Sequence, residues 1–369
     1  MFLLFFLLIL VLLILVHEFG HFVVAKAFGI RVDEFGIFFP PRLWSIKVRE
    51  TTYSLNALPF GGFVKIFGEN PSSAETTEGA ARNHRSFSNK PRLVQAAVIV
   101  AGIICNLLFA WLALSAGYVV GIPTSVEHAG VGVVQGARAT ITSVLPHSPA
   151  EVAGLKSGDT VQAARTGLAE LPSGPGADAL QAFILEHQDE SVVLSVIRNN
   201  EEKAFLAKPV DGLAQGHKAI GIGLDDVGVL QLPPHLALVQ GAVLGAHMTT
   251  AIAGGLWGLL SQALHGTANL ADVAGPIGIV GIGASAVQEG FVATILLTAL
   301  ISINLAIINV LPIPGLDGGR LLFIAIEAIT RRPISERLAV RLTIAGFALL
   351  VTLMLVVSYN DILHLVRPA

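Results

Sequence analysis

The first sixteen residues, MFLLFFLLILVLLILV, carry no charge, and they constrain this chain more than any other stretch. A bilayer core about 30 Å thick requires about 20 mostly apolar helical residues, and four segments come close to that length with little charge. These are residues 1–27, 93–122, 291–311 and 342–358. The composition agrees, since 53% of the 369 residues are hydrophobic and only 13% are charged. We therefore predict a polytopic α-helical membrane protein.

Basic residues set the expected orientation of these segments. Lys and Arg are dense in residues 26–92 and 320–341 and sparse in residues 123–290. Because cytoplasmic loops carry the excess of basic residues, we expect the N-terminus and residues 123–290 outside the cytoplasm. A further segment, 236–263, has no Lys, Arg, Asp or Glu, but if it crossed the membrane it would place residues 312–320 on the wrong side. We predict that it is an interfacial or re-entrant helix, and that the chain has about four transmembrane helices.

The pentapeptide HEFGH, residues 17–21, follows the first apolar run. Positions i and i+4 share one face of a helix, so His17 and His21 can bind one ion while Glu18 lies beside them. A catalytic zinc site uses three protein ligands and keeps one position open for water, whose proton Glu18 would accept. Ionisable side chains within a span are costly, which favours function over a packing seam of mutually satisfied side chains.

Asp317 is the candidate third ligand, because it is the only acidic residue between Glu289 and Glu327. It lies in PIPGLDGGR, whose prolines and glycines force irregular backbone. Such backbone is tolerated at membrane depth only where protein encloses it or where it lines a watery cavity. An ordinary Asp-Gly turn is the alternative, but the expected placement on the same side as HEFGH favours a ligand. The single cysteine, Cys105, excludes a site built on several thiolates.

These motifs resemble the site-2 protease family of intramembrane zinc metalloproteases, most closely its bacterial regulator-of-sigma-E proteases. The likeness spans nearly the whole chain and rests on HEFGH, on NALPFGGFVK at 56–65 and on NVLPIPGLDGG at 309–319. It implies one Zn²⁺ per chain, held by His17, His21 and Asp317, with Glu18 as the catalytic carboxylate. It also implies a substrate cleft shaped by three residues near the last motif, Asn309, Pro312 and Pro314.

The second apolar segment departs from the family pattern. AGIICN has Ile103 where the family usually has proline, although Gly102 and Asn106 remain. We predict that Asn106 contacts the substrate, and hydrogen bonding to a neighbouring helix is an equal alternative.

The first basic segment predicts a β-hairpin, because SIKV and TTYSL alternate on either side of Arg49 and Glu50. The family has a membrane-re-entrant β-loop at this place. A strand edge there could pair with an unwound substrate, so we predict substrate contacts at Gly61, Gly62 and Phe63. A purely structural hairpin is the alternative.

Residues 123–290 are expected to hold a β-rich domain. VLPHSPAEVAGLKSGDTV at 144–161 is similar to a passage of bacterial PDZ domains, and strand-like and helical runs surround it. The predicted organisation therefore has four parts. They are 1–122 with the HEFGH helix, the β-loop and the second span; 123–230, one PDZ-like extracytoplasmic α+β domain; 231–290, an interfacial or re-entrant segment; and 291–369, with the LDGG motif and the last span.

The resemblance implies hydrolysis of a peptide bond in the transmembrane segment of a single-pass protein, such as an anti-sigma factor remnant or a signal peptide. In such regulated intramembrane proteolysis an upstream site-1-type protease acts first. The implied location is the bacterial inner membrane, with the active site toward the cytoplasm. The chain has no basic stripe for nucleic acid. The alternatives are a metal transporter, whose ligands would spread over several spans, and a non-catalytic PDZ-bearing scaffold, whose structural zinc would need four ligands.

Overall fold

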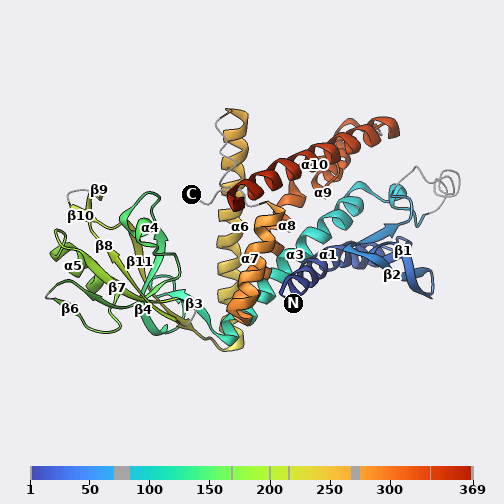
Figure 1. Cartoon of the computed structure of the whole chain (residues 1–369). Coiled ribbons are helices and arrows are strands. Elements are labelled where there is room, and N and C mark those ends of the chain that lie inside the picture. Colours follow the sequence, from blue (N-terminus) through green and yellow to red (C-terminus); the bar gives the residue numbers. More distant parts are fainter. Residues whose placement is uncertain are drawn as a thin grey trace. The chain divides into compact units, whose positions relative to one another are not determined.

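The computed structural model describes residues 2–69, 84–167, 169–198, 201–214, 217–266, 275–332 and 334–366. The chain divides into two compact units. Met1–Leu114 and Gly241–Ala369 form one, here called the helical unit, and Ser115–Gln240 form the other, called the β-rich unit (Figure 1). The boundaries predicted for four parts remain a prediction.

Long apolar helices dominate the helical unit. Among the described residues, five helices are long and apolar enough to cross a membrane, as expected of a membrane protein. They are α1 (Phe2–Ala27), α3 (Arg92–Val120), α6 (Pro234–Leu264), α8 (Phe291–Val310) and α10 (Glu336–Val366). Two shorter helices, α7 (Pro276–Glu289) and α9 (Asp317–Thr330), and a 3-10 turn, η1 (Phe87–Asn89), accompany them. The four predicted segments are all helical, and α10 is longer at both ends than expected.

Helix α6 covers the segment predicted to lie in the interface or to re-enter the membrane. It is one unbroken helix, and by length and composition it could span. However, Figure 1 shows it running across the direction of α1 and α10. Its inner face packs Leu244, Met248 and Ile252 against α3 and α8. The number of spans therefore remains a prediction.

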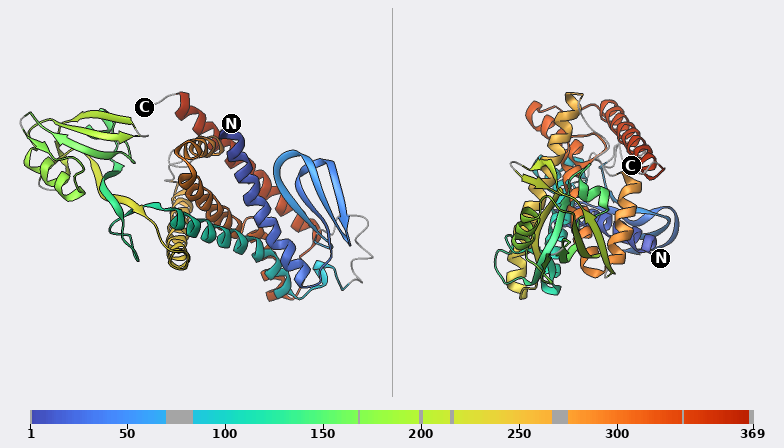
Figure 2. Two further views of the ribbon diagram at one scale, coloured as in Figure 1. Left: turned by 90° about the horizontal axis from the view of Figure 1, so that it is seen from below. Right: turned by 60° about the vertical axis from the view of Figure 1, so that its left-hand side comes forward.

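The strands β1 (Val32–Val48) and β2 (Thr51–Ile66) confirm the predicted hairpin and extend it at both ends. Both strands bend, so residues 32–37 pair with 62–66 on one side, and residues 34–37 pair with 52–55 on the other. Residues 42–48 pair with the far side of 51–56. Buried Asn56 supports the bend, because its amide donates to the carbonyl groups of Ile37 and Phe38. The segment 62–66 is consequently an edge of this small sheet, beside α1 (Figure 2).

Helices α1 and α3 approach each other closely at glycines. A Cβ atom on Gly20 would lie 2.4 Å from the carbonyl oxygen of Ala101, so only glycine allows this contact. Elsewhere in the unit, a carboxylate joins two helices: Asp361 of α10 accepts hydrogen bonds from the backbone N–H groups of Gly275 and Gly278 at 3.0 and 2.9 Å. This caps the start of α7, where the helix dipole favours negative charge.

The β-rich unit contains a seven-stranded antiparallel sheet. The strand order is β3 (Ile122–Ser125), β11 (Ile222–Leu230), β4 (Gln135–Val144), β5 (Thr160–Arg165), β7 (Val192–Arg198) and β8 (Glu201–Ala207), with β6 (Glu170–Leu171) beside β5. Two helices, α4 (Pro149–Ala153) and α5 (Ala177–Glu186), and a hairpin of β9 (Val210–Ala214) and β10 (His217–Ala219) complete the unit. The strand-like and helical runs expected around residues 144–161 are confirmed.

A conventional apolar core holds the β-rich unit together, with Ile141, Leu180 and Leu194 fully buried. A buried ion pair supports this core. Asp159 is 1% exposed, and its two carboxylate oxygens accept hydrogen bonds from the Arg198 guanidinium at 2.6 and 2.7 Å. Asp159 also accepts the backbone N–H of Lys156, which fixes the GLKSGD turn.

Candidate functional site

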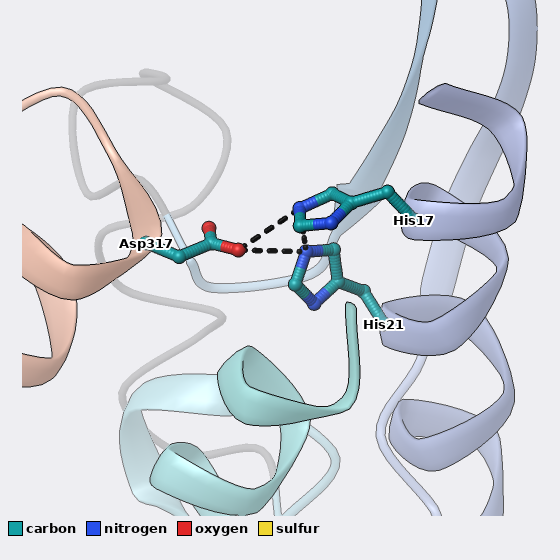
Figure 3. Close-up of side chains that lie close together, drawn as sticks. All are labelled: His17, His21 and Asp317. Atoms are coloured by element: carbon teal, nitrogen blue, oxygen red, sulfur yellow. Dashed lines mark hydrogen bonds and ion pairs between the residues drawn. The ribbon is translucent and has the colours of Figure 1, made fainter. Parts of the chain in front are cut away.

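Three predicted ligands meet in the helical unit. His17 and His21 project from one face of α1, and Asp317 projects from the first turn of α9 (Figure 3). Nearly 300 residues of sequence separate the two groups, yet both imidazole rings are buried. Among the described residues, these three form the group of His, Cys, Asp and Glu side chains that could hold a metal ion.

The three ligand atoms form a small triangle. His17 Nε2 lies 3.2 Å from His21 Nε2, and Asp317 Oδ2 lies 3.0 and 3.3 Å from these two nitrogens. Zinc bonds of about 2.0–2.1 Å in a tetrahedron require ligand atoms about 3.3 Å apart, so the triangle matches one face of that tetrahedron. Asp317 Oδ2 is buried without a hydrogen-bond partner in the described part of the chain. A cation at this place would satisfy it.

Helix α3 fixes the second histidine. His21 Nδ1 lies 2.8 Å from the carbonyl oxygen of Val98, which can only accept a hydrogen bond. Nδ1 therefore carries the hydrogen, and Nε2 of the neutral ring keeps its lone pair for a metal. One turn later on α3, Gly102 leaves room for both rings, because a Cβ atom there would lie 2.5 Å from His21 Cε1 and 2.9 Å from His17 Cε1.

The turn between α8 and α9 aims Asp317 at the histidines. Cβ atoms on Gly318 and Gly319 would lie 2.2 and 2.3 Å from the carbonyl oxygens of Leu311 and Ile313. The chain can fold back this tightly only with glycine at both positions. Gly346 of α10 packs directly on Pro314 in the same way. The LDGG motif thus provides a compact turn with a carboxylate at its exit.

Glu18 lines a polar cavity of about 190 Å³ together with His21 and Asp317. The edge segment of the small sheet contributes Phe63, Val64 and Ile66 to the same cavity. An ion pair between Glu69, just after β2, and Arg320 of α9 forms another part of its wall. The Glu18 carboxylate, two of the three candidate ligands and a strand edge therefore line one cavity.

The other predicted contacts lie around this site. Gly62 is buried against Leu15 of α1 and brings β2 close to that helix, and Gly61 adopts a positive φ of 72° beside it. Asn309 is buried near the end of α8, and Pro312 and Pro314 lie in the turn that carries Asp317. Asn106 is fully buried beside His17. Substrate contact by any of these residues remains a prediction.

Sequence reasoning missed several groups that surround the site. It assigned no role to the Val98 carbonyl or to the Glu69 and Arg320 pair, and it did not recognise that Gly102 provides space for the rings. The spacing of Val98, Gly102 and Asn106 was a usable signal, because steps of four residues place all three on one face of α3.

Ion pairs of Glu50 connect the sheet of β1 and β2 to residues at the end of α1 and before α3. Glu50, in the turn between β1 and β2, pairs with Lys26 at the end of α1 at 2.7 Å and with Arg85 before α3 at 2.6 Å. The Arg85 guanidinium, followed by the Lys26 ammonium, lowers the pKa of Glu50 to about 2. The turn is thus anchored to both sides of the α1 and α3 pair.

Comparisons with known proteins agree over most of the chain. The profile of Peptidase family M50 matches residues 5–353. A candidate zinc metalloprotease of Nostoc sp. is 35% identical over 353 residues, which cover 94% of this chain and 91% of that protein. The zinc metalloprotease RasP of Geobacillus kaustophilus is 29% identical, with 95% of each chain covered. The regulator of sigma-W protease RasP of Bacillus subtilis is 27% identical, with 96% of each covered.

Proposed function

Because this chain belongs to peptidase family M50 and is thus a zinc metalloprotease, we propose that it hydrolyses a peptide bond within the transmembrane segment of a single-pass protein. The observation that carries this proposal is the ligand triangle of 3.0–3.3 Å, two of whose members, His21 and Asp317, line one cavity with Glu18 and a strand edge.

His17, His21 and Asp317 would hold one zinc ion. When bound there, zinc would acidify a water molecule and polarise the scissile carbonyl group. Glu18 takes a proton from this water molecule as the water oxygen forms a bond to the carbonyl carbon of the scissile peptide. Glu18 then returns that proton to the amide nitrogen as the C–N bond breaks, which releases an amine and a carboxylic acid. Three protein ligands leave the fourth coordination position of zinc open for water, as catalysis requires. A structural zinc site has four protein ligands and no open position.

The edge segment 62–66 supports binding of an unwound substrate. A transmembrane helix has its carbonyl groups engaged in hydrogen bonds and must open before a bond can be attacked. An edge strand offers backbone groups to an extended peptide, and side chains of this edge line the cavity of Glu18. Gly61, Gly62 and Phe63 would contact the substrate from this side, and Asn309, Pro312 and Pro314 would shape the cleft near Asp317.

The β-rich unit has a groove of about 400 Å³ between α5 and the start of β11. Residues 222–225 of β11 have β4 on one side, while β3 pairs only with 227–230 on the other. Apolar side chains of α5, including Ile184 and Leu185, face this open edge. This arrangement supports a PDZ-like domain that takes an extended peptide, for example one left by a site-1-type protease.

The membrane placement follows from the basic segments. The N-terminus and the β-rich unit lie outside the cytoplasm in this proposal, the metal centre lies toward the cytoplasmic face of the inner membrane, and α6 lies along the outer interface. The direction of α6 across α1 and α10 supports four spans rather than five. The Bacillus subtilis relative is a regulator of sigma-W protease, which supports a substrate connected with sigma-factor control, such as an anti-sigma factor remnant.

A cleavage assay in membranes tests the activity. Glu18→Gln should abolish cleavage of a tagged single-pass reporter that lacks its outer domain, while zinc per chain stays at one. Cleavage by this variant would remove the catalytic assignment of Glu18.

Crosslinking tests the strand edge. In a Glu18→Gln, Cys105→Ser background, Val64→Cys should form a disulfide with single cysteines in the reporter's transmembrane segment. Ser45→Cys is the matched control, because it lies on the opposite edge of the same sheet. Equal crosslinking at both positions would contradict substrate pairing at segment 62–66.

A further inference from the structure

We propose that Asn106 is a positioning residue for His17: its side-chain oxygen accepts the hydrogen on His17 Nδ1 and so leaves Nε2 free for the metal. This inference rests on the proposed function, in which His17 is a zinc ligand. It replaces the predicted substrate contact of Asn106 with a contact to the metal centre itself.

The geometry places the Asn106 amide against His17. Asn106 lies on α3 and is fully buried, and its amide nitrogen is 3.3 Å from His17 Nδ1. Its amide oxygen is also buried and has no hydrogen-bond partner in the parts of the chain that the structure describes. The oxygen therefore accepts no hydrogen bond from another described group. Rotating the side-chain amide by about 180° would exchange its nitrogen and oxygen and place the oxygen next to His17 Nδ1.

The chemistry of a metal-bound imidazole selects that orientation. A neutral ring carries one hydrogen, so when Nε2 binds a metal the hydrogen must be on Nδ1. A hydrogen on Nδ1 needs an acceptor, and the oxygen of Asn106 is within reach, whereas its nitrogen is a donor. The oxygen and nitrogen of an amide are assigned from their hydrogen bonds, and the bond to His17 assigns the oxygen to this position.

The backbone around Asn106 is held independently of its side chain. Ser302 of α8 is fully buried, and its hydroxyl donates to the backbone carbonyl of Asn106 at 2.8 Å. On the same face of α3, two turns earlier, the Val98 carbonyl orients His21. Helix α3 therefore supplies one acceptor to each histidine, with Gly102 between them to make room. The two acceptors differ in kind: a backbone carbonyl at Val98 and a side chain at Asn106.

The contact with His17 is itself a hydrogen bond to a neighbouring helix, one of the two expectations for Asn106, and the proposal gives this bond a role at the metal centre. A substrate contact would require exposure toward the cleft, and Asn106 is 0% exposed. A link between helices is already provided by Ser302 and the Asn106 backbone, and that link would survive a change of the Asn106 side chain.

Zinc affinity of the full chain tests the proposal without depending on turnover. All variants are made in Glu18→Gln, purified in detergent, and titrated with a chelator of known zinc affinity. Asn106→Leu removes the acceptor and should weaken zinc binding about 10- to 100-fold, the usual loss when a partner of a ligating histidine is removed. Asn106→Asp keeps an acceptor oxygen at the same position and should bind zinc as tightly as Glu18→Gln alone.

Ser302→Ala is the matched control, because it removes the interhelical hydrogen bond and leaves the amide in place. It should lower the melting temperature without changing zinc affinity. Unchanged affinity in Asn106→Leu would overturn the proposal, as would equal losses in Asn106→Asp and Asn106→Leu. If Glu18→Gln itself bound no zinc, the proposed function would fail instead, so the two failures are distinguishable.

Discussion

The helical unit and the β-rich unit are built on different principles. The metal centre of the helical unit depends on backbone that is packed closely at glycines, with Gly20 against Ala101 and Gly102 beneath the two histidine rings. The β-rich unit depends on a conventional apolar core and one buried ion pair. In the helical unit, a single methyl group added at Gly102 would collide with the candidate metal ligands His17 and His21. In the β-rich unit, a substitution in the core would instead lower the stability of that unit.

This difference has a physical origin. Within lipid, helices gain little from burying apolar side chains, so small residues and buried hydrogen bonds fix their contacts. In water, removal of apolar surface from solvent stabilises a sheet at about 25 cal/mol per Å², and polar groups mainly need to be satisfied. Changes near the metal centre should therefore alter chemistry, and changes in the β-rich unit should alter stability.

The largest expected effect follows from Gly102→Ala. The added Cβ would lie within 3 Å of both histidine rings and force them apart. We expect zinc affinity to fall by more than about 100-fold, because both ligands move and not only their supports. Gly258→Ala on α6 is the matched control, since no atom lies within 4 Å of its Cβ position. Chelator competition measures the zinc affinity of both variants. Normal zinc binding by Gly102→Ala would contradict the claim that close packing at this glycine controls the metal centre.

Asp159→Ala should act in the opposite way. It leaves the Arg198 guanidinium without its carboxylate partner, and breaking a buried pair costs about 3–5 kcal/mol. Hydrogen exchange of the full chain should show faster opening of Ser115–Gln240, while zinc per chain stays at one. A loss of zinc in this variant would show that the two units are not independent.

Asp361→Asn tests whether a change elsewhere in the helical unit also affects the metal centre, because Asp361 bonds to Gly275 and Gly278 at the start of α7. The neutral amide is a weaker cap for α7, so we expect a loss of about 1 kcal/mol in stability. The melting temperature should fall slightly with zinc affinity unchanged. Weakened zinc binding would mean that the whole helical unit, and not only the glycine contact, controls the site.

The smallest effect is expected from the ion pairs of Glu50, which are partly exposed. The pKa of Glu50 is lowered to about 2, so these pairs contribute stability above the ordinary carboxyl pKa of about 4 and lose it as the pH falls toward 2. Glu50→Gln should cost less than about 1 kcal/mol at pH 7, and the difference should vanish at low pH. A constant difference across that pH range would contradict this assignment.

The sequence predicted the long helices and the hairpin, because hydropathy and alternation are local signals, and it predicted the convergence of His17, His21 and Asp317 from their motifs and from the side of the membrane that the basic segments indicate. The two Glu50 anchors and the Asp361 cap could not be predicted, and for Asn106 the sequence offered a hydrogen bond to a neighbouring helix but not its partner, His17. Each joins residues that are far apart in sequence, and their side chains have several possible partners until the helices are placed. The status of α6 stayed open for a related reason: a long apolar helix satisfies its backbone hydrogen bonds internally whether it crosses the membrane or lies along it.

X-ray absorption at the zinc edge of the purified Glu18→Gln chain tests whether His17, His21 and Asp317 bind the metal. We expect one zinc per chain with two imidazole nitrogens at about 2.0–2.1 Å and carboxylate oxygen at about 2.0–2.2 Å. Asp317→Ala in the same background should remove the carboxylate contribution and most of the bound zinc. A sulfur ligand near 2.3 Å, which only Cys105 and methionines could supply, or an unchanged spectrum in Asp317→Ala, would contradict the assignment of these three ligands.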